Sequence, residues 1–208
     1  MTVRPVETAQ AEQYGTMLMA FVANQTTRRG PAGPQAWQHR SRLATFSGRT
    51  RQLDGPGLVL PYLVSVLEEF ALVRLRERVG DDLPDNPLVA HLWSKSEAEV
   101  EANWDKQLNA WKDCYGVTLS AFPRHQQLRG YREARNAIVH GLGHLTPRQL
   151  RGDGGQRTTQ QLHQVGVRLE GRRLQLDESH LRDCARTARE FITWLDHQAQ
   201  SAHVVAPT

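Results

Sequence analysis

The sequence predicts an all-α fold, a helical bundle of about five helices with a small β-hairpin before the last helix. Apolar residues recur at intervals of three and four along most of the chain, which is typical of amphipathic helices. Glycine and proline clusters interrupt this pattern, and one short stretch near residue 170 alternates apolar and polar residues as a strand does. The 208 residues are enough for one sizeable core. We therefore predict a single domain over residues 1–208, with its core at about 58–195 and an N-terminal extension at 1–54.

The first two helices are predicted from the spacing of apolar residues. Residues 9–24 place Tyr14 and Leu18 on one helical face, and the sequence RRGPAGPQ ends that helix. Residues 61–79, PYLVSVLEEFALVRLRERV, are apolar nearly all round, which is typical of a helix at the centre of a bundle. Pro61 is expected in the first turn, where its missing N–H has no helical partner to lose.

The middle of the chain predicts a long amphipathic helix, or a pair of helices, over residues 85–115. One face of this stretch carries large apolar residues that we expect in the core: Trp104, Leu108, Trp111 and Tyr115. After a break at Pro123, a further helix is expected over about 124–140, and Gly141 is well placed to end it.

The last third of the chain predicts short elements followed by one long helix. Thr146 and Pro147 resemble the cap and first turn of a short helix, and QRTTQQ is expected to be a loop. The sequence VGVRLEGRRLQLD predicts the β-hairpin, with its turn at residues 170–172. Asp177 can cap the final helix. The buried face of that helix is expected to consist of Leu181, Cys184, Ala188, Phe191 and Leu195.

Positive charge is concentrated near the N-terminus. Residues 26–53 contain six arginines and no acidic residue, whereas acidic residues gather in residues 81–113. A basic segment of this kind favours an anionic partner such as nucleic acid, and Arg40 and Arg42 are candidate RNA contacts. Arginine makes up 23 of the 26 basic residues, a bias that a GC-rich genome alone would also produce.

The sequence gives no indication of a membrane span, a leader or a metal site. No apolar run approaches the roughly 20 residues that a membrane span needs, and the sequence MTVRPVETAQ lacks the apolar stretch of a secretory signal. We therefore expect a cytoplasmic protein with no membrane partner. Cys114 and Cys184 lack metal-type spacing and are interpreted as small buried hydrophobic residues. His140 and His144 are four residues apart, but glycines interrupt the helix that a metal site would need, so neither metal nor cofactor is predicted.

The main candidate site lies in the sequence YREARNAIVHGLGH, residues 131–144. The helical spacing predicts an apolar face through Leu128, Tyr131, position 135, Ile138 and Leu142, and position 135 is an arginine. A buried guanidinium is costly unless a carboxylate or another anion pairs with it. The central helix offers Glu68 or Glu69 as the partner, through a two-pronged hydrogen bond.

Two further polar side chains belong with Arg135. Asn136 and His140 are four residues apart and share one helical face, which the long side chain of Arg135 can reach. A permanent cation, an amide and a histidine, which can exchange a proton near neutral pH, are suited to binding and cleaving a phosphodiester.

Arg135, the polar Asn136, three further residues and His140 resemble the signature of the HEPN superfamily, helical domains of which many are metal-independent ribonucleases. The resemblance extends to the SVLEEF sequence of the central helix, the helix ending in His-Gly, the Thr-Pro turn, the hairpin and the Asp-capped last helix. Together these features resemble the HEPN group related to RiboL-PSP toxins, over about residues 58–195.

The resemblance implies a homodimer in which two such helices face each other across one composite active site. His140 would act as general base or acid when the RNA 2′-hydroxyl attacks the adjacent phosphate and leaves a 2′,3′-cyclic phosphate. Arg135 would hold that phosphate, Asn136 would orient the histidine or bind a phosphate oxygen, and Glu68 would hold the arginine. Arg132 is a further candidate RNA contact. DNA should stay intact because it lacks the 2′-hydroxyl.

The family also implies a toxin or antiviral-defence effector that is restrained by a protein antitoxin or a defence partner. In family members silenced by nucleotidylation, a tyrosine stands two residues after the histidine; here that position is Leu142, so this route of silencing is not expected. Two alternatives stay open. Arg135 and Glu68 can be a purely structural pair, and the chain can be a non-catalytic module that binds RNA or dimerises.

Overall fold

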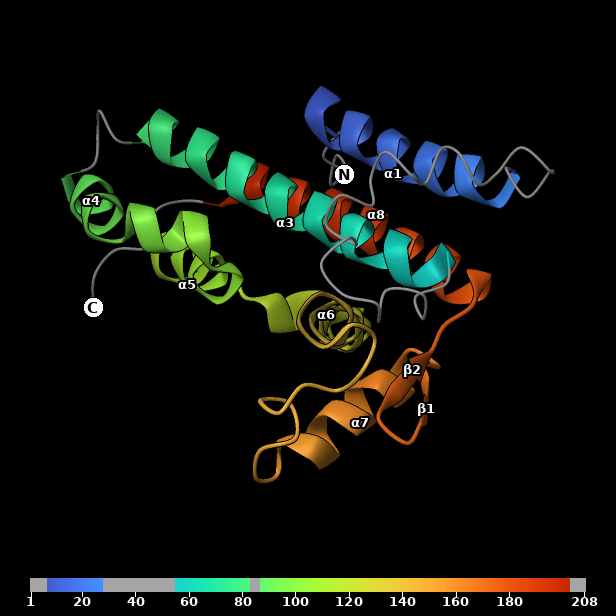
Figure 1. Cartoon of the computed structure of the whole chain (residues 1–208). Coiled ribbons are helices and arrows are strands. Elements are labelled where there is room, and N and C mark those ends of the chain that lie inside the picture. Colours follow the sequence, from blue (N-terminus) through green and yellow to red (C-terminus); the bar gives the residue numbers. More distant parts are fainter. Residues whose placement is uncertain (1–6, 28–54, 83–86, 203–208) are drawn as a thin grey trace. The chain divides into compact units, whose positions relative to one another are not determined.

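The computed structural model describes residues 7–27, 55–82 and 87–202, and these are mostly helical (Figure 1). A two-stranded antiparallel sheet precedes the last helix, so the predicted all-α class with a β-hairpin is confirmed. The described part contains seven α-helices and one short 3-10 helix, more than the about five expected. Within it, no helix is both long and apolar enough to cross a bilayer. Arg40, Arg42 and the tail after residue 202 lie outside the described residues.

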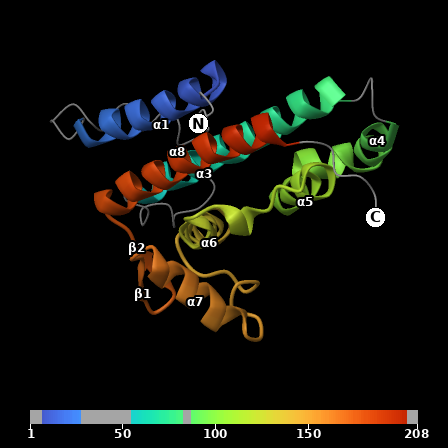
Figure 2. The same ribbon diagram turned by 180° about the vertical axis from the view of Figure 1, so that it is seen from behind.

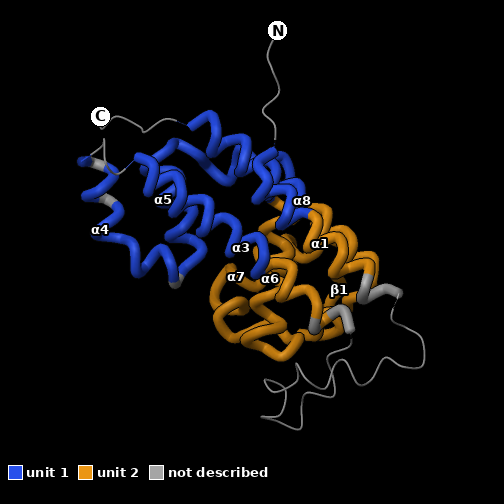
Figure 3. The backbone as a smooth tube through the Cα atoms, turned by 90° about the horizontal axis from the view of Figure 1, so that it is seen from above, with its two compact units in different colours: residues 1–15, 65–125, 189–208 blue, residues 16–64, 126–188 orange. Residues whose placement is uncertain are grey.

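The chain divides into two compact units, each assembled from segments that are distant in sequence (Figure 3). Unit 1 consists of residues 1–15, 65–125 and 189–208, and unit 2 consists of residues 16–64 and 126–188. Three long helices are divided between the two units: α1 (Ala9–Thr27), α3 (Gly55–Asp82) and α8 (Glu178–Ser201). The first residue of α6, His125, also falls in unit 1. The single domain over residues 1–208 stays a prediction.

The helix α3 begins earlier than its sequence suggested. It starts at Gly55, so Pro61 lies inside the helix and not in its first turn. The expected start at Pro61 was wrong because GPGL, which precedes it, has the composition of a loop. A proline in a helix interior lacks the N–H of one helical hydrogen bond, and the apolar residues after Pro61 compensate by burial: Leu63, Val64, Val66 and Leu67 are all 6% exposed or less.

In unit 1, the stretch at 85–115 is a pair of helices, α4 (Pro87–Ala102) and α5 (Trp104–Tyr115). Asn103 separates them and caps α5, since its side-chain oxygen accepts hydrogen bonds from the amides of Asp105 at 2.9 Å and Lys106 at 3.3 Å. Gly116 ends α5 with a left-handed φ of 69°. The 3-10 helix η3 (Leu119–Ala121) follows.

Aromatic side chains fill the core of unit 1. The fully buried ring of Phe191 lies 5.8 Å from the ring of Trp104 and 5.5 Å from that of Phe122, both edge to face. The expected core residues Trp111 and Tyr115 are also buried. The indole nitrogen of Trp111 donates to the carbonyl of Ala71 at 3.2 Å, so that its polar atom is satisfied inside the core.

A buried carboxylate holds the first turn of α1 within unit 1. The side chain of Asp196, on α8, is fully buried. It accepts hydrogen bonds from the amide and the hydroxyl of Thr8, at 2.8 and 2.9 Å, and from Gln200 at 3.0 Å. The Nε atom of Arg74, on α3, lies 3.1 Å from the same carboxylate. The positive charge of Arg74 and the four hydrogen-bond and ion-pair contacts together offset the cost of burying the Asp196 carboxylate.

Unit 2 contains most of α6 (His125–Gly141), together with α7 (Gly154–Gln164), β1 (Arg168–Glu170) and β2 (Arg173–Gln175). The hairpin pairs Leu169 with Leu174, and its turn falls at residues 171–172, as expected. The left-handed φ of 62° at Gly171 suits such a two-residue turn.

The prediction that QRTTQQ is a loop was wrong, because it lies inside α7. Only Thr158 and Leu162 of this helix are buried, four residues apart, so its apolar face was too short to recognise. The helix packs closely on α6: a Cβ atom added at Gly130 would lie 2.4 Å from the carbonyl oxygen of Gln161. Figures 1 and 2 both show α7 and the hairpin beside α6.

The final helix, α8, follows its sequence pattern. All five residues of its expected buried face are 3% exposed or less. Asp177 caps the helix, since its carboxylate accepts hydrogen bonds from the amides of Ser179 at 2.8 Å and His180 at 3.2 Å. Cys114 and Cys184 are free and buried, and burial raises the pKa of both thiols, which fits their interpretation as hydrophobic residues.

Candidate functional site

The C-terminal half of α6 carries three of the predicted catalytic residues. The buried face of the helix consists of Leu128, Gly130, Tyr131, Ala134, Ala137 and Ile138. Arg135 is therefore not in the apolar face as predicted; it flanks that face and is half-buried, and Leu142 is exposed. The predicted path was wrong because it took a step of four after Tyr131, whereas the helix buries Ala134, a step of three away.

The guanidinium of Arg135 leans toward its neighbour on the helix. Its Nη1 atom donates a hydrogen bond to the side-chain oxygen of Asn136 at 3.3 Å. Its Nε atom is buried and makes no hydrogen bond within the described residues. A buried donor without an acceptor is costly, so this arginine retains capacity for an anion.

His140, one turn after Asn136, is exposed at the last turn of α6. Its ring makes no hydrogen bond or ion pair with any described residue, so both ring nitrogens are open to a ligand. Val139 and Leu142, on either side in sequence, are unusually exposed for apolar residues, at 45% and 36%. The histidine thus sits in an accessible, partly apolar surface.

The chain turns sharply after α6. The helix ends at Gly141, as expected, and Leu142 after it takes the left-handed conformation, with a φ of 52°. The amide of Gly143 then donates back to the carbonyl of Ala137 at 3.1 Å. A leucine in this conformation carries strain of about 1 kcal/mol or more that a glycine would not. The helix end is therefore closed in a strained turn beside His140.

The segment after this turn, residues 143–149, is named here the return segment, and it fixes the hairpin to the end of α6. The amide of Leu145 donates to the carbonyl of Arg172 at 2.8 Å, and the amide of Leu174 donates to the carbonyl of Gly143 at 2.9 Å. His144 thereby forms a β-bridge with Arg173. Because these are main-chain bonds, the hairpin turn is held close to the helix end that presents His140.

The second half of the return segment is anchored by a reciprocal cap. The side-chain oxygen of Gln149 accepts from the amide of Thr146 at 3.0 Å, and the Thr146 hydroxyl accepts from the amide of Gln149 at 3.2 Å. The cap predicted at Thr146 is present, but residues 147–150 form only a turn and not the short helix expected after it. The left-handed Gly152, with a φ of 55°, follows directly.

The remaining predicted site residues are placed as follows. Arg132 is half-buried on α6 and already has an interaction partner within the protein. Glu68 belongs to unit 1 whereas Arg135 belongs to unit 2, so their predicted pairing stays a prediction. Arg40 and Arg42 lie outside the described residues.

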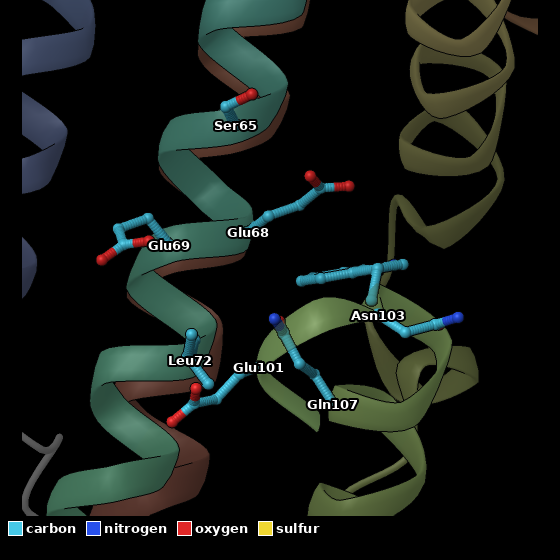
Figure 4. Close-up of a pocket in the computed structure, with 8 residues that line it drawn as sticks. Ser65, Glu68, Glu69, Leu72, Glu101, Asn103 and Gln107 are labelled. Carbon is cyan, nitrogen blue, oxygen red and sulfur yellow. The ribbon is translucent and has the colours of Figure 1, made fainter. Parts of the chain in front are cut away.

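Glu68 lines a pocket of about 210 Å³ in unit 1, between α3 and the start of α5 (Figure 4). Its lining consists of Ser65, Glu68, Glu69, Leu72, Glu101, Asn103, Trp104 and Gln107. Glu101 is already paired with Arg76. Among the described residues, no three histidine, cysteine, aspartate or glutamate side chains are placed to hold a metal ion. The lining of the pocket is thus acidic, with three glutamates of which Glu101 is paired.

The sequence did not single out the return segment and the hairpin turn as parts of the site. Arg172 falls in the predicted hairpin turn, and the main-chain hydrogen bonds of Leu145 and Leu174 show that the hairpin adjoins the segment after α6. The one available signal was the Thr-x-x-Gln pattern at 146–149, which marks a cap. Comparisons of this chain with protein-family models, with curated proteins and with solved structures give no match.

Proposed function

We propose that this protein is a metal-independent RNA endonuclease of the HEPN type. The observation that carries the proposal is the arrangement on α6, where an accessible His140 follows Arg135 and Asn136, whose side chains are hydrogen-bonded to each other at 3.3 Å. A cation with an unsatisfied buried donor, an amide and an open imidazole at one helix end are suited to a phosphodiester.

In the proposed reaction, His140 of one copy removes the proton from an RNA 2′-hydroxyl, and the 2′-oxygen bonds to the adjacent phosphorus. The bond from phosphorus to the 5′-oxygen breaks, and a second protonated histidine gives its proton to that oxygen. The products are a 2′,3′-cyclic phosphate and a 5′-hydroxyl, so that protons and charges balance without a metal. Arg135 stabilises the negative charge that grows on the phosphate oxygens.

The second histidine is provided by a homodimer in which two α6 ends face each other. The exposed side chains of Val139 and Leu142 support this part of the proposal, because a partner surface would remove both from water. Control by a protein antitoxin or a defence partner, and location in the cytoplasm, belong to the same family resemblance and are proposed on that basis alone.

The test is an RNA cleavage assay with the purified full chain, with and without EDTA. We expect wild-type protein to cleave mixed-sequence RNA in EDTA and to leave DNA of the same sequence intact. His140→Ala and Arg135→Ala should lower the rate by about 10²- to 10⁴-fold, because a general acid or base and a charge-stabilising group contribute this much. His163→Ala, which changes an exposed histidine on α7, is the matched control and should leave the rate unchanged.

Product analysis completes the assay. Mass spectrometry of the fragments should find 2′,3′-cyclic phosphate ends. The proposal is wrong if both variants cleave like wild type, or if DNA is cut as fast as RNA. RNA binding without product would instead identify the non-catalytic module.

A further inference from the structure

Unit 2 has a marked excess of positive charge. Its described residues, 16–27, 55–64 and 126–188, contain eleven arginines, no lysine and six carboxylates. Some of these carboxylates are hydrogen-bonded by neutral groups. Glu133 accepts from the side-chain amide of Gln149 at 2.7 Å, and Asp183, which also pairs with Arg186, accepts from the Tyr131 hydroxyl at 2.7 Å. The positive charge of the arginines is therefore only partly compensated within the unit.

Six of the eleven arginines are exposed and have no ion pair or side-chain hydrogen bond within the described part of the chain: Arg129, Arg148, Arg151, Arg157, Arg168 and Arg172. Two others, by contrast, are exposed and paired, Arg182 with Glu178 at 3.8 Å and Arg186 with Asp183. The unpaired set is thus the part of the surface that is available to an anionic partner.

Two of the unpaired arginines are held next to the end of α6. Arg172 is in the hairpin turn, and its carbonyl accepts from the amide of Leu145 in the return segment. Arg148 lies within the return segment itself, between the capping pair of Thr146 and Gln149. Gln149 also donates from its side chain to the carbonyl of Glu133 on α6, at 3.0 Å.

Packing brings the same segment against the residue that follows His140. A Cβ atom added at Gly141 would lie 3.2 Å from the methyl group of Thr146, so the return segment touches the last turn of the helix. The backbones that bear Arg148 and Arg172 are therefore fixed to this helix end, so that only their side chains, and not the main chain, have to be ordered when a ligand binds.

We infer that Arg148 and Arg172 form a phosphate-binding rim beside His140 that holds the RNA backbone on either side of the bond to be cut. The inference rests on the proposed ribonuclease function and adds two positioning residues to it. One guanidinium group can donate two hydrogen bonds to the oxygens of one phosphate. Contacts to phosphate do not depend on the base sequence, so the rim supplies affinity and alignment but no base preference.

The experiment measures binding of a fluorescein-labelled 12-nucleotide single-stranded RNA to the full-length His140→Ala protein, by fluorescence anisotropy between 50 and 200 mM salt. Adding Arg148→Ala and Arg172→Ala together should weaken binding at 50 mM salt on the order of tenfold and lower the salt slope by about 0.7 per arginine. The matched control adds Arg182→Ala and Arg186→Ala, which removes the same charge from the same unit at arginines that are already paired.

The control pair should change binding and slope far less than the rim pair. Equal effects of the two pairs, or no effect of the rim pair, would overturn the rim. Thermal melting of every variant checks that the chain stays folded, and since all four positions are exposed we expect unchanged midpoints.

The two proposals can fail separately. If the rim pair weakens binding as described but wild type yields no cleaved RNA, the rim stands and the nuclease falls. If wild type cleaves and His140→Ala does not, yet the rim pair binds like the control pair, the nuclease stands and the rim falls. If no form of the protein binds RNA, both fall.

Discussion

Gln149 binds Glu133 twice, donating from its side-chain amide to the main-chain carbonyl at 3.0 Å and to the carboxylate at 2.7 Å. The same side chain accepts from Thr146 through its oxygen. One buried amide therefore ties the return segment to the helix that carries Arg135 and His140. None of these partners is near Gln149 in an extended chain, apart from Thr146.

Replacing Gln149 should therefore destabilise unit 2. We expect Gln149→Ala to lower the free energy of unfolding by about 1–3 kcal/mol, because Gln149 is only 8% exposed and its loss leaves polar groups without partners. Urea denaturation followed by circular dichroism measures the change. Gln160→Ala, at an exposed position of α7, is the control and should change the stability by less than about 0.5 kcal/mol. Equal stability of the two variants would contradict the anchoring role.

The close packing of α6 on α7 predicts that Gly130 tolerates no side chain. Gly130→Ala would place a Cβ atom 2.4 Å from the Gln161 carbonyl and 2.8 Å from a methyl of Val165, so the helices must separate. We expect a loss of at least about 2 kcal/mol.

Gly80→Ala is the control for Gly130→Ala. Gly80 lies in α3 with no atom within 4 Å of the added Cβ, so Gly80→Ala should raise stability by about 0.5–1 kcal/mol through helix propensity. Chemical denaturation of both variants, side by side, distinguishes the clash from a general effect of alanine. A neutral Gly130→Ala would mean that the two helices are not in contact.

The cap of α8 predicts a pH-dependent contribution to stability. The hydroxyl and amide of Ser179 and the amide of His180 donate to Asp177, and these hydrogen bonds lower the pKa of its carboxyl from 3.8 to about 2. Since the folded pKa is the lower one, the cap stabilises the protein fully above about pH 4, and this contribution is lost as the pH falls toward 2.

Asp177→Ala should therefore cost about 1 kcal/mol at pH 7, and the difference from wild type should shrink below pH 4. Asp177→Asn keeps an acceptor oxygen for the amides, so it should retain much of the stability while losing the pH dependence. Denaturation curves between pH 2 and pH 7 measure both. A wild-type advantage over Asp177→Ala that is as large at pH 2 as at pH 7 would refute the assignment.

The buried carboxylate of Asp196 should be among the most sensitive positions in unit 1. Asp196→Ala removes the acceptor of both Thr8 donors and one of the two carboxylates that the described residues place beside Arg74, which then keeps only Glu77 at 3.0 Å. We expect a loss of about 3–5 kcal/mol in the free energy of unfolding. Glu190→Ala, at an exposed carboxylate on the same helix, should change it by less than about 1 kcal/mol. Similar melting points for the two variants would argue against the buried network.

Substitutions at Leu142 distinguish its backbone strain from its proposed contact with a partner copy. Leu142→Gly removes the strain at a φ of 52° and should leave stability equal or higher, whereas Leu142→Val, with a branched Cβ, should lower it by about 1 kcal/mol. If Leu142 also contacts a partner copy, Leu142→Gly should raise the dimer dissociation constant while the monomer stays folded. Thermal melting and analytical ultracentrifugation give the two readouts.

The spacing of apolar residues predicted the fold class well, because the buried face of a helix or strand repeats at a regular interval along the sequence. The buried face of α8 and the hairpin followed directly from that spacing. The sequence of α7 shows almost no apolar pattern, since the helix buries only two residues. Its contact with α6 is made at a glycine, which such a pattern does not reveal. The predicted start of α3 was wrong for a different reason. Glycine and proline favour turns, but they can lie in a helix when the surrounding packing outweighs that preference.

The residues of the candidate site were chosen from the sequence, but the segments around them could not be. Spacing alone brings Asn136 and His140 to one face, because this follows from the helical repeat. It could not tell whether Arg135 lies in the buried face or beside it, since steps of three and four both fit the pattern. The approach of the hairpin turn to Leu145 depends on chain reversal over more than 25 residues, for which a single sequence holds no local signal.

The division of α1, α3 and α8 between the two units has a practical consequence for dissecting this protein. No single cut in the chain releases either unit whole, and a deletion that reaches beyond residues 1–15 or 189–208 removes pieces of both. An inactive truncation would then say nothing about where activity resides. Point substitutions, or a split chain whose fragments are expressed together, are the appropriate tools for assigning a role to either unit.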